Sequence, residues 1–271
     1  MTIDQWLTKA VQRLVAHGSG TSRLDALVML EDGLQTDRAN LLAHTDRLLN
    51  AEQLKQLDGW LKRRLQHEPL AYIRGRTEFY GRDFVINQSV LEPRPESETM
   101  IEQLKQLKLD RPAILDVGTG SGAIGITAAL ELPDSAVSLL DIDPAALEVA
   151  KTNLAKYDLK LAVIKNDLLA GLAESYDVLL CNLPYVPDNF QVNEAAMREP
   201  RLAIFGGADG LDLYRRLFAQ AAALRPAPTY ILTESLPTQH DTLAAVATQN
   251  GYHQTVEDDF IQVFQAAKAT L

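Results

Sequence analysis

A length of 271 residues allows one large or two modest domains with an ample core. With 26 Lys and Arg against 36 Asp and Glu, the net charge is −10, which argues against a basic face for duplex or ribosomal RNA. The single Cys suits a reducing cytoplasm, the five His show no metal-ligand spacing, and no apolar run is long enough for a membrane span, so we expect a cytoplasmic protein with no metal site and no membrane or direct nucleic acid partner.

The first 75 residues carry apolar side chains at helical spacing in three segments, 3–16, 22–32 and 51–66. Gly18, Gly20 and Gly33 separate them, as residues at helix boundaries do. We therefore predict a small helical domain over 1–75. Aromatic and β-branched residues over 77–91 then predict a short β-hairpin, within a linker over 76–94.

Helices and strands are predicted to alternate from residue 95 to the end. The helices include 96–107, 144–156 and 211–224, and the strands include 113–117, 137–140, 161–165, YDVLLC before Asn182, 229–233 and two closing strands. This alternation predicts a parallel, doubly wound α/β sheet, whose ligands lie at the carboxyl ends of the strands. Gly118, Asp141, Asp167 and Asn182 all fall at such ends, so we expect them in one crevice.

The segment AILDVGTGSGAIGITAAL is predicted to form a strand, a glycine-rich turn and a helix. Gly118, Gly120 and Gly122 permit a tight turn and let a ligand touch the backbone. Asp141 ends the next apolar run, 19 residues after Gly122, which matches the spacing of an acidic residue that accepts hydrogen bonds from a ribose. These residues predict a cofactor that contains a nucleoside.

Two cofactors fit this pattern. The hexapeptide GSGAIG matches the dinucleotide pattern GxGxxG, which keeps an oxidoreductase open. However, the glycines begin directly after Asp116 and Val117, and such an early acid is typical of the S-adenosylmethionine loop. That ligand has no pyrophosphate and carries an ammonium and a sulfonium, so it tolerates nearby acids. We favour the methyl donor.

The sequence Asn182-Leu183-Pro184-Tyr185 follows a buried strand. The Asn side-chain oxygen and the next backbone carbonyl can each accept one N–H and so orient a planar NH2 group towards a donor. Because the lone pair of an amide or aniline-type nitrogen is conjugated, positioning must supply much of the rate. The element predicts methyl transfer to nitrogen. The alternative is that Asn182 only caps the following turn.

Other residues have structural interpretations. Asp143 precedes Pro144 and is interpreted as a helix cap. Cys181 is interpreted as a buried strand residue because no paired base is evident. Arg94 and Glu98 either brace the substrate loop or form a structural salt bridge.

Three further stretches flank these elements: EPLAYIRG, EFYGRDFVINQSVLEPRPESE and EPRLAIFGGADGLDLYRRL. With ILDVGTGSGAIGI they cover most of 67–217, and in them the chain resembles the HemK-type release-factor glutamine methyltransferases. The chain departs from that family at three places. Leu183 replaces the first Pro of the usual Asn-Pro-Pro-Tyr, Leu168 stands where an aromatic residue is common, and EDDFIQVFQAAKATL lacks a Gly-Arg-Asp-Arg pattern.

The resemblance implies a class I Rossmann-like methyltransferase domain over 95–271 that methylates the glutamine of the Gly-Gly-Gln loop of peptide chain release factors, while the helical domain helps to grip the protein. It implies that S-adenosylmethionine is bound with its ribose on Asp141 and its adenine near Asp167 and Leu168, by the set Gly118, Thr119, Gly120, Ser121, Gly122, Asp141, Asp167, Leu168 and Asn182. It further implies that Asn182, Leu183, Pro184 and Tyr185 bind the substrate glutamine, with Asn182 and Tyr185 as the catalytic residues.

Two alternatives remain open. The Asn-Leu-Pro-Tyr form is also similar to that of ribosomal RNA adenine dimethyltransferases, in which it would hold an exocyclic adenine nitrogen; the net charge, the helical domain and the Arg-Pro-Glu-Ser-Glu segment disfavour this. A non-catalytic binding protein with a methyltransferase fold is disfavoured by the intact glycines, Asp141 and Asn182.

Overall fold

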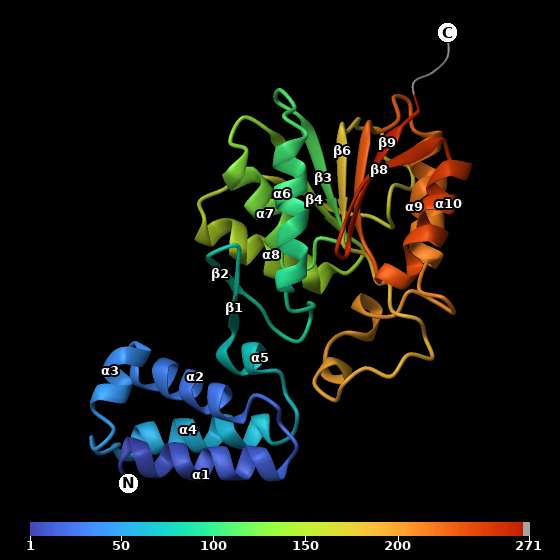
Figure 1. Cartoon of the computed structure of the whole chain (residues 1–271). Helices are drawn as coiled ribbons and strands as arrows, with labels where there is room; N and C mark the ends of the chain where they lie inside the picture. The colour runs from blue at the N-terminus through green and yellow to red at the C-terminus, as the bar shows by residue number, and fades with distance from the viewer. Residues whose placement is uncertain (268–271) are drawn as a thin grey trace. The chain divides into compact units, whose positions relative to one another are not determined.

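The computed structural model describes residues 1–267, which divide into two compact units. One unit comprises Met1–Gly75 with Asn193–Arg198, and the other comprises the rest of the described chain (Figure 1). Residues 268–271, at the end of the segment without the Gly-Arg-Asp-Arg pattern, lie outside the described residues.

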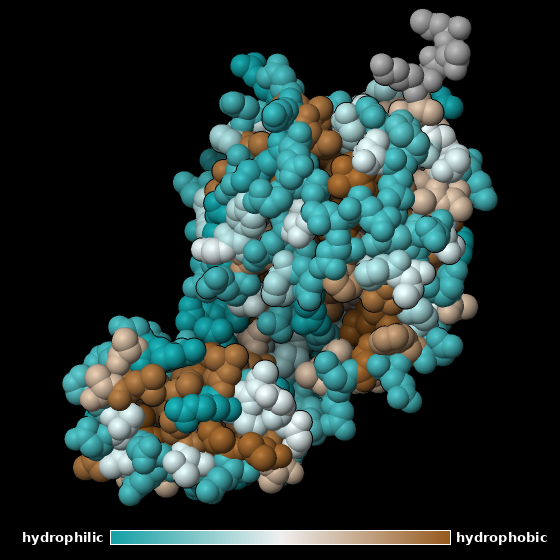
Figure 2. All heavy atoms as spheres, in the orientation of Figure 1, coloured by the Kyte–Doolittle hydropathy of each residue, from teal (hydrophilic) through white to brown (hydrophobic). Residues whose placement is uncertain are grey.

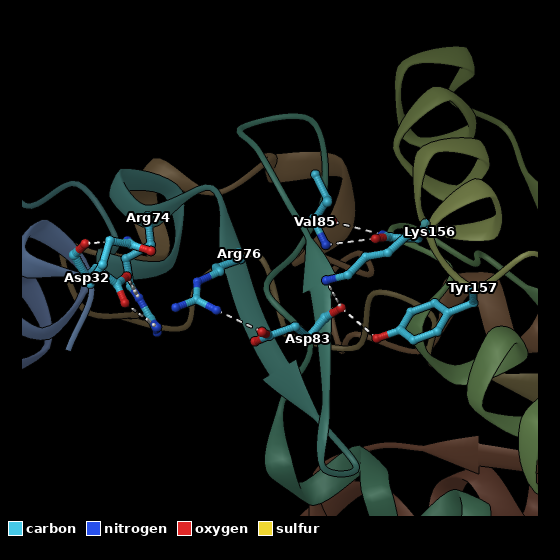
Figure 3. Close-up of polar contacts among 9 residues, drawn as sticks. Asp32, Arg74, Arg76, Asp83, Val85, Lys156 and Tyr157 are labelled. Atoms are coloured by element: carbon cyan, nitrogen blue, oxygen red, sulfur yellow. Dashed lines mark hydrogen bonds and ion pairs between the residues drawn. The ribbon is translucent and has the colours of Figure 1, made fainter. Parts of the chain in front are cut away.

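The helical unit contains the three predicted helices, α1 (Ile3–Ala16), α2 (Ser22–Leu34) and α4 (Ala51–Arg64). Two short helices, α3 (Arg38–Ala43) and α5 (Leu70–Arg74), were not predicted, because so few residues show no clear period. Trp6, Leu30 and Leu57 are buried in the core of this unit. An ion pair of 2.6 Å between Asp32 and Arg74 ties α5 to α2 (Figure 3).

The surface of the helical unit includes exposed hydrophobic residues. On the face drawn in Figure 2, hydrophilic residues predominate over the sheet unit, whereas hydrophobic residues are prominent over the helical unit. Val15, Leu24, Leu42 and Leu48 of this unit are exposed by 45% to 71%. Within residues 1–267, no helix combines the length and the hydrophobicity that crossing a bilayer would need.

The second unit is built on a seven-stranded sheet of order β5-β4-β3-β6-β7-β9-β8. The strands are β3 (Ala113–Val117), β4 (Ala136–Asp141), β5 (Ala162–Lys165), β6 (Val178–Cys181), β7 (Tyr230–Glu234), β8 (Tyr252–Asp258) and β9 (Ile261–Ala266). β3 to β7 are parallel to one another, as predicted, and β9, one of the two closing strands, departs from the predicted parallel sheet because it runs antiparallel to β7 and β8. Only two residues join β8 to β9, too few for a parallel crossover.

Helices cover both faces of this sheet. α6 (Glu98–Gln106), α7 (Ala123–Glu131) and α8 (Pro144–Lys156) cover one face, and α9 (Asp212–Ala223) and α10 (His240–Gln249) cover the other (Figure 1). Alternate strand residues serve the two layers: Ile114 packs towards α6 to α8, whereas Leu115 packs towards α9 and α10. The sandwich holds the carboxyl ends of the parallel strands in fixed register.

The predicted hairpin is formed by β1 (Arg76–Phe79) and β2 (Arg82–Val85). It packs on α8, where Lys156 Nζ and Tyr157 Oη donate to the carbonyl of Asp83 at 2.5 and 2.6 Å (Figure 3). The buried side chain of Asn153 accepts from the N–H of Val85 and donates to its carbonyl. The same NH2 group donates to the carbonyl of Ser121 at 2.8 Å, so one residue holds both the hairpin and the glycine loop.

Candidate active site

A cavity of about 250 Å³ lies at the carboxyl ends of β3 to β6. Nearly all of the site residues predicted from the sequence line it: Gly118, Thr119, Gly120, Ser121, Asp141, Asp167, Leu168, Asn182, Leu183 and Pro184. Gly122 and Tyr185 are not among the lining residues and act from behind it. The expected convergence of four strand ends on one crevice is confirmed.

The glycine loop is held by the neighbouring strand. Gly118, Gly120 and Gly122 have φ values of 74°, 54° and 83°, which side chains rarely adopt. The N–H groups of Gly118 and Thr119 donate to the carbonyl of Leu140 in β4 at 2.8 and 2.9 Å. Gly122 is the residue directly before α7, and its positive φ shapes the turn into that helix.

Asp141 presents a fixed carboxylate to the cavity. Its Oδ2 accepts the N–H of Gly120 and its Oδ1 accepts the N–H of Asp143, both at 2.9 Å. The residue is 9% exposed, and burial raises the pKa of its carboxyl. Each oxygen keeps a lone pair for a further donor, which suits a ribose diol. Asp143 itself caps α8 by accepting the N–H of Ala145 at 2.8 Å, which confirms its interpretation.

Asp116, the early acid of the glycine pattern, is a support behind the loop. It is 1% exposed and does not line the cavity. Its Oδ2 accepts the hydroxyl of Thr119 at 2.5 Å and the N–H of Gly125 at 2.9 Å. Burial is the main cause that raises its pKa to about 6, with the nearby Asp141 charge a smaller one. The acid therefore joins the loop to the first turn of α7.

Asp167 and Leu168 follow β5 and line the same cavity. Asp167 forms an ion pair of 2.6 Å with Arg216, and both side chains are about half exposed. Leu168 has φ 50° and is buried. The side chain of Asn166 donates to the carbonyls of Leu168 and Ala170 at 2.9 Å, which fixes this turn. A contact of these two residues with adenine stays a prediction.

Asn182 and Leu183 present two acceptors at the cavity. Asn182 Nδ2 donates to Ser97 Oγ at 2.9 Å, and the N–H of Leu183 donates to Tyr214 Oη at 3.3 Å. In the part of the chain that the structure describes, no group donates to Asn182 Oδ1 or to the carbonyl of Leu183. The Leu183 side chain is 3% exposed and packs against Gly118. The replacement of Pro by Leu thus leaves the carbonyl in place.

The end of this element is fixed from β7 and its surroundings. Tyr185 Oη donates to Glu234 Oε1 at 2.9 Å, and the carbonyl of Tyr185 accepts the side-chain NH2 of Gln239 at 2.8 Å. A Cβ at Gly206 would lie 2.2 Å from the carbonyl of Pro184, so the following loop packs directly on the element. Burial raises the pKa of Tyr185 and keeps the phenol neutral.

Known proteins share both parts of this chain. A family model described as the PrmC N-terminal domain matches residues 5–75, and the methyltransferase small domain model matches residues 94–199. A release factor glutamine methyltransferase of Koribacter versatilis is 38% identical, with 81% of each chain covered. One of Moorella thermoacetica is 39% identical over 83% of this chain and 82% of the relative, and one of Coxiella burnetii is 33% identical over 92% of each.

The chain belongs to the release factor glutamine methyltransferase family. Solved structures add the fold alone. The catalytic domain of hMettl16 in complex with the MAT2A 3'UTR hairpin 6 superimposes with a TM-score of 0.55 at 15% identity, covering 68% of this chain and 74% of that one. A methyltransferase from Pyrococcus furiosus gives 0.51 at 16% identity, covering 69% and 90%. The structure is therefore a methyltransferase-type α/β fold with a helical unit characteristic of the family.

Sequence reasoning missed three residues of this family member's site. They are the buried polar residues Ser97, Glu199 and Glu234, which form hydrogen bonds or ion pairs with residues in or next to the site. Glu199 accepts the N–H of Glu92 at 3.1 Å and forms a short ion pair with Arg94. Pro200, Leu202 and Ala203, which follow Glu199, line the cavity. Arg94 therefore braces a cavity loop through an ion pair, which unites the two interpretations offered for it.

Two further titratable groups near the site, those of Cys181 and Glu98, have structural roles. Cys181 is fully buried in β6, and burial raises the pKa of its thiol, so it is a strand residue as expected. Glu98 accepts the N–H of Tyr80 in the hairpin at 2.7 Å. Among residues 1–267, no group of His, Cys, Asp and Glu is arranged to hold a metal ion.

Proposed function

We propose that this protein transfers a methyl group from S-adenosylmethionine to the side-chain amide nitrogen of the glutamine in the Gly-Gly-Gln loop of peptide chain release factors. The observation that carries the proposal is the pair of unengaged acceptors, Asn182 Oδ1 and the Leu183 carbonyl, at the edge of the cavity. Two adjacent acceptors match the two N–H bonds of a primary amide. The names of the relatives supply the class of substrate.

The cavity fits a cationic nucleoside better than a dinucleotide. Arg216 is the only Lys or Arg among the lining residues, and it is paired with Asp167. A pyrophosphate would thus meet Asp141, Asp143 and Asp167 with no unpaired cation to balance it. We propose that Gly118 to Gly122 and Asp141 hold the cofactor, with its adenine near Asp167 and Leu168. When bound, S-adenosylmethionine supplies an electrophilic methyl group on a positively charged sulfur.

The chain's own residues do the positioning. Asn182 Oδ1 and the Leu183 carbonyl each accept one N–H of the glutamine amide and hold the nitrogen in a fixed orientation. Pro184 keeps Leu183 extended, and Tyr185 stiffens the end of the element through Glu234. No strong base is required beforehand, because the proton leaves after the nitrogen has become positive. Both acceptors are also placed to stabilise the developing positive charge on nitrogen.

The helical unit suits a protein substrate. Its exposed Val15, Leu24, Leu42 and Leu48 provide apolar contact surface, whereas a net charge of −10 disfavours nucleic acid. We propose that residues 1–75 help to grip the release factor and that the enzyme works in the cytoplasm, where release factors meet ribosomes. A ribosomal RNA adenine methyltransferase remains the second candidate, because two adjacent acceptors also suit an exocyclic adenine amine.

The direct test is methylation of a purified release factor. The substrate should gain 14 Da, about one methylene, on its Gly-Gly-Gln glutamine, located by peptide mass spectrometry. A glutamine-to-alanine release factor is the matched control and should gain nothing. Methylation of bare ribosomal RNA with none on the release factor would favour the ribosomal RNA adenine methyltransferase instead. Binding of a nicotinamide cofactor would favour an oxidoreductase.

The Asn182→Ala variant distinguishes a catalytic role of Asn182 from a role as a cap of the following turn. If Asn182 holds the substrate nitrogen, the variant should keep its melting temperature and lose roughly a hundredfold or more in turnover. If Asn182 only caps a turn, the variant should lose about 1 kcal/mol of stability with modest kinetic change. Leu183→Pro is the companion variant and should remain active, since the carbonyl stays. Near-normal single-turnover methylation by folded Asn182→Ala would rule the mechanism out.

A further inference from the structure

A chain of three polar side chains runs from the sheet to the substrate acceptor. Glu234 lies at the end of β7 and Ser97 just before α6, and each is 1% exposed. Ser97 Oγ lies 2.5 Å from Glu234 Oε2, and Asn182 Nδ2 lies 2.9 Å from the same Ser97 oxygen. These residues are 137 and 85 positions apart in sequence, so only the fold brings them together.

The direction of these hydrogen bonds follows from chemistry. When Glu234 is ionised, its carboxylate can only accept, so the single hydroxyl proton of Ser97 is then donated to it. The Ser97 oxygen must then act as an acceptor towards Asn182, and only the NH2 group of Asn182 can donate to it. Amide orientation in a protein is decided by such networks. The oxygen of Asn182 is consequently turned to the other side, where no described residue donates to it.

We propose that Glu234 and Ser97 are positioning residues that fix the orientation of the Asn182 side-chain amide, so that its oxygen rather than its NH2 group faces the substrate nitrogen. This rests on the proposed function, in which Asn182 accepts an N–H. A reversed amide would present two donors to an NH2 group, so the substrate nitrogen would be repelled instead of held. The polarity of the chain, and not only its shape, therefore matters for turnover.

The burial of a carboxylate supports this role over a structural one. Tyr185 donates to the second oxygen of Glu234 at 2.9 Å, so the same group also holds the other end of the substrate element. A neutral Gln or Met would join β7 to α6 with a smaller desolvation cost, because a buried charge is expensive. Burial raises the pKa of Glu234, and Glu96 adds to this, while hydrogen bonds from Ser97, Tyr185 and the side chain of Asn182 lower it, so Asn182 also interacts with Glu234 directly. Costly buried charge of this kind is concentrated at functional sites.

Two substitutions interrupt the hydrogen-bonded set of Glu234, Ser97 and Asn182 at different points. Ser97→Ala removes the relay, and Glu234→Gln replaces the obligatory acceptor with an amide that can also donate and so permits the reversed arrangement. Each folded variant should bind S-adenosylmethionine within about twofold of the original protein. Each should lose roughly tenfold to a hundredfold in the single-turnover rate. Because both act on the same chain, the double variant should be little worse than either single one.

The matched control variants lie outside the hydrogen-bonded set of Glu234, Ser97 and Asn182. Glu148→Gln alters an exposed ion pair with Lys151, and Ser135→Ala removes a bond to a backbone carbonyl away from the site. Both should leave the rate unchanged. Folded Glu234→Gln with the original rate, or two single losses that multiply in the double variant, would overturn the proposal.

A second readout does not depend on the substrate. In protein with ¹⁵N-labelled Asn, the side-chain NH2 resonance of Asn182, assigned from its absence in Asn182→Ala, should exchange slowly with water because it donates to buried Ser97. Ser97→Ala should make that exchange faster than in the original protein, although the direct interaction of Asn182 with Glu234 remains. If the original protein methylates no release factor, the proposed function fails, yet slow exchange that becomes faster in Ser97→Ala would still support the fixed amide. Fast exchange in the original protein would refute it whatever the substrate.

Discussion

Replacing Asp141 with Ala is expected to weaken cofactor binding through the loss of hydrogen bonds to the ribose. A hydrogen bond to a charged acceptor contributes about 1.5 to 3 kcal/mol, which is roughly tenfold to a hundredfold in affinity. The same substitution also leaves the N–H groups of Gly120 and Asp143 without their acceptor. A lower affinity by itself would therefore not distinguish a ribose contact from a distorted glycine loop.

A cycle that also changes the ligand makes this distinction. Calorimetry would compare S-adenosylhomocysteine with its 2′-deoxy and 3′-deoxy analogues on the original protein and on Asp141→Ala. On the original protein, removing a contacted hydroxyl should cost tenfold or more. On the variant the same removal should cost less than about twofold, because the acceptor is gone.

Asp143→Ala is the matched control for this cycle. Asp143 caps α8, so its removal should weaken the ligand and its analogues by the same factor. The reasoning is refuted if neither missing hydroxyl has a smaller penalty in Asp141→Ala than in the original protein. A penalty that vanishes in Asp143→Ala instead would move the ribose contact to that residue.

Two further predictions concern stability behind the loop. The folded pKa of Asp116, about 6, lies above its ordinary 3.8, so the folded state holds this proton more tightly. Its contribution to stability should therefore rise as pH falls through 6, by about 1 kcal/mol between pH 7.5 and 5 relative to Asp116→Asn, measured by denaturant unfolding without cofactor. Gly125→Ala should destabilise the protein by about 1 to 3 kcal/mol, because its Cβ would lie 2.3 Å from Leu139 Cδ2. Gly59→Ala, whose Cβ would meet open space, should stabilise the protein by up to about 1 kcal/mol. The same change in unfolding free energy for both variants would contradict the packing around Gly125.

Local pattern predicted most of the elements of this fold and several residues of the site. β3 and α8 lie where they were predicted because an apolar run or a helical period identifies them without reference to the rest of the chain. Asp141 was found because an acid that ends an apolar strand has a recognisable spacing. Glu234 ends the strand segment YILTE in the same way, so the same signal could have found it.

Long-range pairing could not be read from the sequence. Ser97 lies in the quoted Arg-Pro-Glu-Ser-Glu segment, but nothing local indicates that its hydroxyl meets β7. The same holds for Glu199 and its bond to Glu92, 107 positions away. The antiparallel course of β9 follows from a two-residue turn that the predicted alternation of helices and strands did not resolve.

Three buried carboxyl groups, those of Asp116, Asp141 and Glu234, surround the ends of β3, β4 and β7, and burial raises the pKa of each. A cation that enters such a site stabilises the ionised carboxylates and is itself attracted. The proposed donor carries a sulfonium that its demethylated product lacks, so we expect the donor to bind more tightly than the product. The dissociation constant of the product divided by that of the donor should grow from pH 5.5 to pH 8, because Asp116 loses its proton near pH 6. Calorimetry at both pH values, repeated with Asp116→Asn, tests this. A ratio that does not change with pH in the original protein would show that the buried carboxylates do not discriminate donor from product.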